Sequence, residues 1–142
     1  MCGVEAARDA PPIPSRDGAE VEAPGKSAAA AGPATAAAGA ASAGASAYCA
    51  AKASEIHLAR CLALEGAVHG IRVNTVSPGY VVTEGTHTAG ITGSEMEAGF
   101  VAQTPLGRAG HPGDIADVVA FLASDEARWL TGENITASGG IR

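Results

Sequence analysis

The stretch Gly-Ile-Arg-Val-Asn-Thr-Val-Ser-Pro-Gly, residues 70–79, decides the fold class of this 142-residue chain. Between Ile71 and Val76 the side chains alternate in the way that is typical of a β-strand. Pro78 and Gly79 then end the strand, because proline has no N–H for a sheet ladder and glycine accepts turn conformations. The stretch predicts one short strand that closes in a sharp turn.

A long helical pattern precedes this strand, over residues 46–67. Ser46 is the expected N-cap, because its hydroxyl can accept a bond from an unpaired N–H of the first turn. Gly66 or Gly70 is expected to end the helix. The residues expected on its buried face are apolar or nearly so and recur at helical spacing: Leu58, Cys61, Leu62 and Val68.

A second helix and a second strand follow. Residues 114–123 predict an amphipathic helix whose apolar stripe consists of Ile115, Val118, Val119 and Leu122. Residues 134–137 predict a final short strand. The intervening stretch 84–107 predicts a mobile excursion with one short helix around residues 95–103. Helix, strand, helix and strand in this order are typical of an α/β sheet.

The first 47 residues have a different composition. They contain few aliphatic side chains larger than alanine, namely Val4, Ile13 and Val21. Residues 28–47 are almost wholly Ala, Gly and Ser, and Gly32 and Pro33 would interrupt a helix there. We therefore expect a loop with fraying helical turns. The predicted division is a poorly ordered, low-complexity leader over 1–47 and a folded part over 48–142.

Composition excludes several classes of function. The net charge is −6 and no basic stripe is present, which argues against nucleic acid as a partner. No apolar run approaches the roughly 20 residues that span a bilayer, and no secretion signal is visible. Cys49 and Cys61 on one helix would lie about 18 Å apart and could not form a disulfide. A reducing cytoplasm suits them.

Tyr48 and Lys52 stand four residues apart in Tyr-Cys-Ala-Ala-Lys, so both side chains leave the same face of the predicted helix. An ammonium favours the ionised form of a neighbouring phenol. Such a pair can exchange a proton with a carbonyl or alcohol oxygen near neutral pH. The same spacing also arises in helices where the ring merely packs and the amine is solvated.

The segments that follow this pair decide between the two interpretations. In order they are Tyr48–Lys52, the strand and turn at 70–83 with Asn74, Pro105–Arg108, His111–Ala116, and Leu130–Asn134 with Ser138-Gly139-Gly140. This series closely resembles the C-terminal half of the short-chain dehydrogenase/reductase family. The resemblance runs from about Thr35 to Arg142, and it implies a partial Rossmann-type parallel sheet.

The resemblance also implies roles for single residues. Tyr48 would be the proton donor and acceptor, and Lys52 would tune it and bond the nicotinamide ribose hydroxyls. Thr35 occupies the position, thirteen residues before the tyrosine, where relatives place a serine that bonds the substrate oxygen. Ser42 is an alternative, and a plain loop threonine remains open. The turn that would hold the carboxamide end of the nicotinamide is formed by Pro78, Gly79, Val81 and Thr83, whereas Asn74 would be structural.

The implied activity is that of an NAD(P)-dependent oxidoreductase that interconverts a secondary alcohol and a ketone, with the stretch 84–107 over the substrate. Either NAD or NADP remains open. The resemblance further implies a small-molecule substrate and a homodimer or homotetramer. The glycine-rich phosphate turn of the family is not found before Ala47, so a truncated enzyme is expected. The alternative is a non-catalytic fragment or pseudoenzyme that acts, if at all, as a partner-binding subunit.

Two further features are expected to be structural. His57 and Cys61 stand four residues apart, a spacing that can chelate a metal, but no second pair accompanies them and no metal site is predicted. Trp129 is expected to pack or to contact another subunit.

Overall fold

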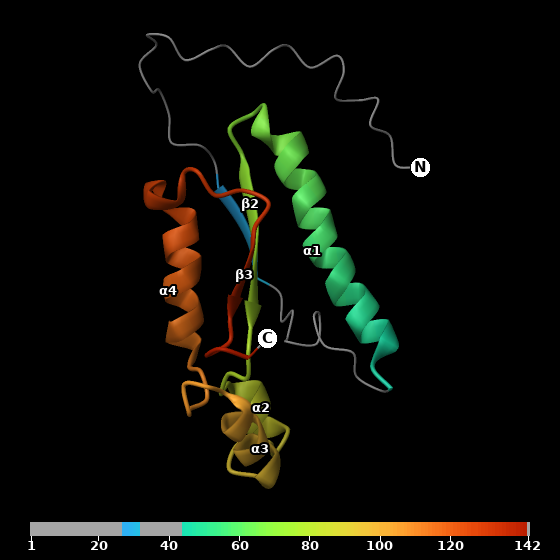
Figure 1. The fold of residues 1–142 in the computed structure, drawn as a ribbon, viewed down its shortest axis with the longest axis vertical. Coiled ribbons are helices and arrows are strands. Elements are labelled where there is room, and N and C mark those ends of the chain that lie inside the picture. Colours follow the sequence, from blue (N-terminus) through green and yellow to red (C-terminus); the bar gives the residue numbers. More distant parts are fainter. Residues whose placement is uncertain (1–26, 32–43, 142) are drawn as a thin grey trace.

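The computed structural model describes residues 27–31 and 44–141 and shows a three-stranded parallel sheet. Its strands are β1 (Ser27–Ala31), β2 (Arg72–Pro78) and β3 (Asn134–Ala137), in the order β1-β2-β3. In this register Ala29 lies opposite Asn74, and Val76 lies opposite Ile135. The three carboxyl ends therefore lie at one edge of the sheet, which is the lower edge in Figure 1.

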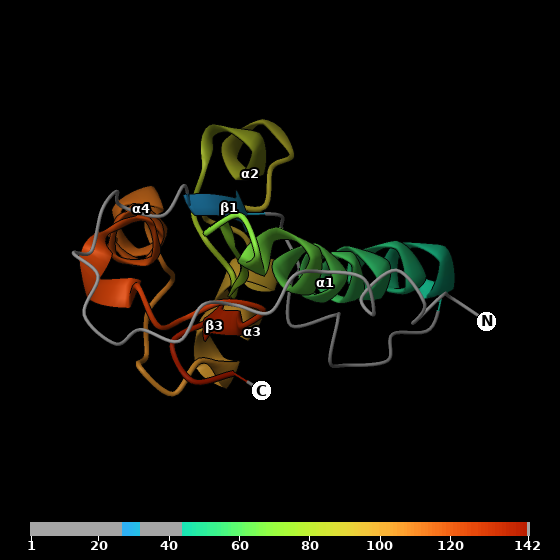
Figure 2. The same cartoon turned by 90° about the horizontal axis from the view of Figure 1, so that it is seen from above.

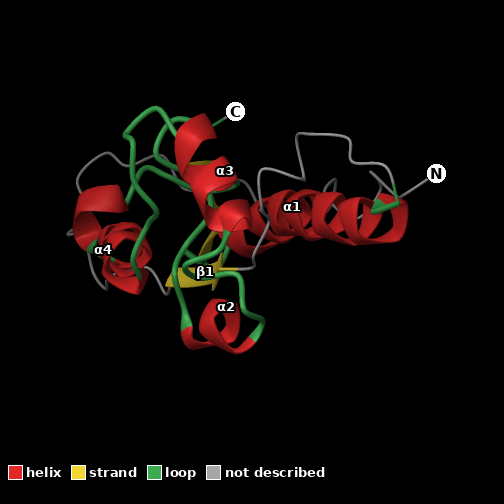
Figure 3. Ribbon diagram, turned by 90° about the horizontal axis from the view of Figure 1, so that it is seen from below, coloured by secondary structure: helices red, strands yellow, loops and turns green. Residues whose placement is uncertain are grey.

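Helices cover both faces of this sheet. Helix α1 (Ser46–Ala67) lies on one face and α4 (Pro112–Ala123) on the other, with the short 3₁₀ helix η2 (Asp125–Ala127) after α4. Figure 2 shows the sheet between the two helices. Helices α2 (Glu84–Thr88) and α3 (Glu95–Gln103) lie beyond the carboxyl ends of the strands (Figure 3). The predicted α/β class and Rossmann-type parallel sheet are confirmed.

Strand β2 is the centre of the fold. All five residues from Val73 to Ser77 are buried, so the strand is covered on both faces. Helices α1 and α4 cover its opposite faces. Buried polar groups of β2 need partners, and Asn74 has two. Its Nδ2 donates to Leu130 O at 2.9 Å, and its Oδ1 accepts from Glu133 N at 3.1 Å.

The α4 side holds the larger hydrophobic core. Val76, Leu122 and Ala127 are at most 1% exposed. The residues packed around them are Ile115, Val118, Val119, Leu130, Ile135 and Ala137. The predicted stripe of α4 is thus confirmed. Burial of this cluster is the main favourable term that fixes α4 on the sheet.

The α1 side is packed through small residues. Ala59 and Ala63 are buried against Val73, with Ile71 beside them. The predicted buried stripe is wrong, because Leu58, Leu62 and Val68 are 58, 43 and 50% exposed. Alanines let the helix backbone come close to the strand, which turns the neighbouring leucines away from the sheet.

The two ends of α1 agree only in part with the ends predicted from the sequence. Ser46 is the first helical residue and Ala45 is the N-cap, with no side-chain capping bond, so the predicted serine cap is wrong. At the other end Gly70 adopts a φ of 67°. Ile71 N donates to Gly66 O and Gly70 N to Ala67 O, both at 3.0 Å. This is the Schellman pattern, which needs a left-handed residue.

Three more differences concern local elements. Ser27–Ala31 form a strand rather than fraying helical turns, because pairing with β2 outweighs the helix preference of alanine. Helix α2 was not predicted, whereas α3 lies at the predicted residues 95–103. Trp129 is 91% exposed and does not pack within the described part of the chain. Thr35 and Ser42 lie outside the described residues, and the predicted division at residue 47 stays a prediction.

Candidate active site

Tyr48 and Lys52 lie on the side of α1 that faces the sheet. The spacing from Tyr48 to Lys52, and on to Ala59 and Ala63, is four, seven and four residues, which keeps all four on one helix face. The two alanines are buried against β2, so they define which face this is. The Tyr–Lys pair therefore continues the sheet-facing row toward the amino end of the helix.

The same row reaches the carboxyl edge of the sheet. Helix α1 runs opposite to β2 (Figure 1), and Tyr48 precedes the two alanines by eleven to fifteen residues, a distance of about 16–23 Å along a helix. Gly79 follows Val73 by six residues, about 20 Å along a strand. Tyr48 and the Pro78-Gly79 turn thus lie at the same level, where ligands of open parallel sheets bind.

The Lys52 ammonium has a defined position. Its side chain is only 14% exposed, and Nζ lies 5.9 Å from the centroid of the Tyr48 ring. Nζ donates to Glu55 Oε1 at 2.8 Å and to Glu55 Oε2 at 3.0 Å. Tyr48 itself is 42% exposed. Glu55 was not singled out from the sequence, although its position three residues after Lys52 is a known helix-pair spacing.

Close packing against β3 explains why the turn at Pro78-Gly79 contains glycine. Gly79 N donates to Ala137 O at 3.1 Å, and a Cβ on Gly79 would lie 2.8 Å from Ser138 Cα. Only glycine lets the end of β2 approach the end of β3 this closely. A role of Gly79 toward a nicotinamide ring stays a prediction.

Val81 and Thr83 connect this turn to its surroundings. Val81 bridges Gly110 in parallel fashion, and Val82 N donates to Gly110 O at 3.0 Å. The Thr83 hydroxyl accepts from Thr86 N at 3.3 Å and so caps α2. Both residues hold the backbone beyond the carboxyl edge in place.

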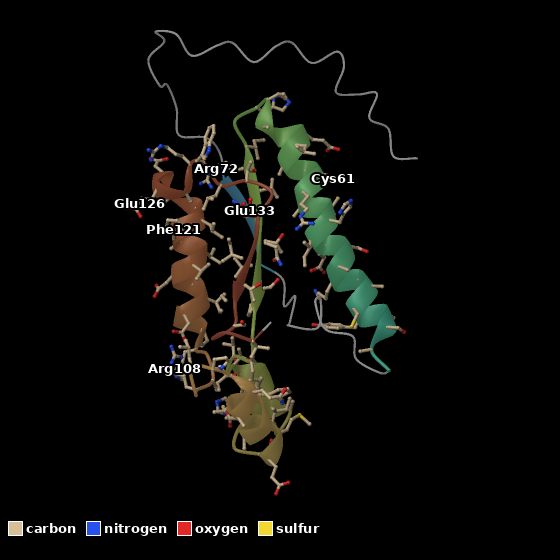
Figure 4. All side chains as sticks on the ribbon, in the orientation of Figure 1. Cys61, Arg72, Arg108, Phe121, Glu126 and Glu133 are labelled. Atoms are coloured by element: carbon tan, nitrogen blue, oxygen red, sulfur yellow. The ribbon has the colours of Figure 1, made fainter. Side chains whose placement is uncertain are left out.

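Arg108 and Asp114, which the sequence analysis missed as a pair, form an ion pair on the α4 side of this edge. Arg108 Nη1 donates to Asp114 Oδ2 at 2.8 Å, and Arg108 Nη2 to Asp114 Oδ1 at 2.9 Å. The Arg108 bonds and a bond from His111 N hold the pKa of the Asp114 carboxyl far below its usual range, and Asp114 raises the pKa of Arg108. Figure 4 shows Arg108 near one end of α4 and Arg72 near the other end.

A cavity of about 460 Å³ lies at this edge, on the α4 side. It is lined by residues that include Tyr80, Leu106, Arg108, Ile115, Ala137 and Ser138. Tyr80, which was not predicted as a site residue, stacks on Phe100 with ring centroids 4.9 Å apart. Neither Tyr48 nor Lys52 lines this cavity, so the structure does not bring the predicted acid–base pair and the cavity into one site.

The described part of the chain holds two cysteines and no cluster of metal-ligating side chains. Cys49 and Cys61 are both free thiols, as their separation on one helix predicts. Within residues 27–31 and 44–141 no three His, Cys, Asp or Glu side chains gather to hold a metal. No helix among these residues is long and apolar enough to cross a bilayer.

Comparison with known proteins assigns the family. The profile of the family described as enoyl-(acyl carrier protein) reductase, a short-chain dehydrogenase/reductase profile, matches residues 21–142. The chain belongs to the short-chain dehydrogenase/reductase family. It is 70% identical over 95 residues to an uncharacterized oxidoreductase of Methylorubrum extorquens, which covers 67% of this chain and 38% of that protein.

Other family members are more distant. The chain is 44% identical over 94 residues to the 3-oxoacyl-[acyl-carrier-protein] reductase of Haemophilus influenzae, covering 66% of this chain and 38% of that protein. A 7α-hydroxysteroid dehydrogenase solved with NADH and 7-oxo glycochenodeoxycholic acid superimposes with a TM-score of 0.72 and 31% identity, covering 81% of this chain and 44% of that one. The chain thus spans less than half the length of these relatives.

The described residues fit one end of a nicotinamide nucleotide. Lys52 offers N–H donors at the carboxyl edge of the sheet, as a ribose would require. A pyrophosphate favours a helix N-terminus with free N–H groups and no negative charge. The first turns of α2, α3 and α4 carry Glu84, Glu95 with Glu97, and Asp114. These three helices do not fit the pyrophosphate end.

Proposed function

We propose that this chain supplies the Tyr–Lys acid–base element of an NAD(P)-dependent oxidoreductase that interconverts a secondary alcohol and a ketone. The observation that carries the proposal is the sheet-facing row of α1, which brings Tyr48 and Lys52 to the level of the Pro78-Gly79 turn. The family assignment supports it, since relatives include a hydroxysteroid dehydrogenase solved with NADH and an oxo-steroid.

The proposed proton chemistry uses a single group. During reduction the Tyr48 hydroxyl would give its proton to the carbonyl oxygen while the carbonyl carbon gains a hydride, and during oxidation the phenolate would take the alcohol proton. The nicotinamide, when bound, supplies or accepts that hydride. Lys52 would hold the ribose hydroxyls and the charge beside Tyr48, with Pro78, Gly79, Val81 and Thr83 at the carboxamide end. Thr35 remains a proposed substrate-bonding residue outside the described part.

The proposal extends to substrate and partners. The substrate is a small carbonyl compound or alcohol, held between the carboxyl edge of the sheet and helices α2 and α3. A homodimer or homotetramer in the cytoplasm is proposed as well. The exposed leucines of α1, Leu58, Leu62 and Leu64, and its C-cap residue Val68 are available for such a subunit contact.

Turnover by a Tyr48→Phe variant tests the proposed chemistry. Phenylalanine keeps the ring and removes only the proton-carrying hydroxyl, so reduction of a small ketone by NADH or NADPH should cease while circular dichroism stays that of the wild type. An unchanged rate in the variant would refute the role of Tyr48. A wild-type chain without turnover would favour the second candidate.

A non-catalytic, partner-binding role is that second candidate. It is favoured by the acidic first turns of α2, α3 and α4, which do not suit a pyrophosphate. Such a subunit would bind its partner through the exposed surface of α1 and would not bind the nucleotide. Sedimentation of the chain with and without NADH separates the two candidates, because only the first predicts nucleotide that co-sediments with the protein.

A further inference from the structure

Glu55 contacts the Lys52 ammonium in this structure. Both carboxylate oxygens accept from Nζ, at 2.8 and 3.0 Å. Lys52 lies one turn after Tyr48, and Glu55 lies one turn after Lys52, so the three side chains form a row along α1. Nζ thus lies between the Tyr48 ring, 5.9 Å from its centroid, and the Glu55 carboxylate.

The number of N–H groups on Lys52 makes this contact consequential. An ammonium has three donors and no acceptor. Both oxygens of Glu55 accept from Nζ, so the side of the ammonium that faces this carboxylate is occupied. A ribose diol that is bonded by Nζ must therefore approach from another side or displace the carboxylate.

Burial distinguishes this pair from an ordinary surface ion pair. The Lys52 side chain is 14% exposed, whereas the Glu55 side chain is 47% exposed. The ammonium is thus enclosed on the sheet-facing side of α1, while its partner carboxylate remains accessible to water. Since Lys52 has little solvent around it, Glu55 is the group that sets where its charge is placed.

We propose that Glu55 is a positioning residue, which holds Lys52 before the nucleotide binds and competes with the nicotinamide ribose for its N–H groups. This inference rests on the proposed function for the identity of the competing ligand. The contact between Glu55 and Lys52 can be tested without any nucleotide. Exposed and half-exposed ion pairs change equilibria by about two- to fivefold, and this is the size of effect expected.

Reductive methylation of the lysines in the cofactor-free chain tests the contact. Lys26 is the other lysine of the sequence and serves as the internal reference in the same sample. With formaldehyde and a borohydride reagent, the rate at Lys52 relative to Lys26, measured by peptide mass spectrometry, should rise about two- to fivefold in Glu55→Gln. Glu55→Asp, which keeps the carboxylate, should lie between the two. Glu65→Gln is the matched control, because Glu65 is an exposed glutamate on the same helix.

The outcomes separate this inference from the proposed function. Equal relative rates in the wild type and in Glu55→Gln would overturn the positioning role of Glu55, whatever the nucleotide does. If NADH binds the wild-type chain, Glu55→Gln should tighten binding about two- to fivefold, and weaker binding would overturn the competition. Absence of NADH binding together with a faster Lys52 reaction would sink the proposed function and leave the positioning role of Glu55 supported.

Discussion

Arg108 and Asp114 show how single residues set the pH dependence of this fold. The ion pair with Arg108, and next the His111 N–H, lower the pKa of Asp114 in the folded chain. A lowered folded pKa contributes stability above the unfolded pKa of about 3.9, and this contribution is lost as the pH falls through the folded pKa. Asp114→Asn should therefore lower the denaturant midpoint at pH 7.

The size of that effect should depend on pH. The difference in midpoint between wild type and Asp114→Asn should shrink steadily as the pH is lowered from 4 toward 2, because the carboxyl of the unfolded chain then binds a proton that the folded, ion-paired carboxylate does not. Urea unfolding followed by circular dichroism at several pH values measures the difference. A difference that is constant from pH 7 to pH 2 would show that the ion pair does not act through the protonation of Asp114.

Leu122 is the residue on which packing of α4 depends most. It is 1% exposed within the core formed with Val76 and Ala127. Leu122→Ala should lower the free energy of unfolding by about 2–5 kcal/mol through lost burial and a residual cavity. Leu64→Ala is the control, because Leu64 is 80% exposed and should change stability by at most about 0.5 kcal/mol. Similar losses in both variants would contradict the assigned core.

At the scale of elements, the turn between α1 and β2 holds the sheet-facing row in place. Gly70 has a φ of 67°, which a residue with a Cβ adopts only with strain. Gly70→Ala should cost about 1–2 kcal/mol in unfolding free energy. Gly113→Ala should be neutral or stabilising, since Gly113 lies in α4 with open space around it and alanine favours helix. Thermal unfolding of both variants tests the turn, and an equally stable Gly70→Ala would argue against it.

Elements were predictable where a local signal marks them. The run 46–67 up to Gly66 and Gly70, the apolar stripe of α4 and the strand at 134–137 all agree with the structure. The buried face of α1 was placed one position away, at Leu58 and Leu62, because the sequence alone does not reveal that close approach to β2 selects Ala59 and Ala63. Strand β1 depends on its partner β2 and has no local signal in an alanine run.

At the scale of the whole molecule, the site depends on pairings between distant segments. The position of Tyr48 and Lys52 on one helix face could be derived from their spacing, and the structure keeps them together. The contact between Glu55 and Lys52 could have been predicted from the same helical spacing, because the two residues are three apart on one helix. Arg108 and Asp114 are six residues apart, and the loop between them contains Gly110, which pairs with Val81. That pairing joins residues far apart in sequence, which no local pattern indicates.

The α/β/α arrangement places Tyr48 and Lys52 on the α1 side of the carboxyl edge, whereas Val81 lines the cavity on the α4 side. Lys52 is proposed to bind a nicotinamide nucleotide on the α1 side. A bond from a charged donor contributes about 1.5–3 kcal/mol, which corresponds to roughly ten- to hundredfold in affinity.

A fluorescence titration of NADH and NADPH against the chain, its Lys52→Ala variant and the control Arg60→Ala tests this claim most directly. Arg60 is exposed on the same helix and outside the row. We expect saturable binding by the wild type and by Arg60→Ala, and binding weaker by roughly ten- to hundredfold in Lys52→Ala. Equal affinity in all three proteins, or no saturable binding by the wild type, would contradict it.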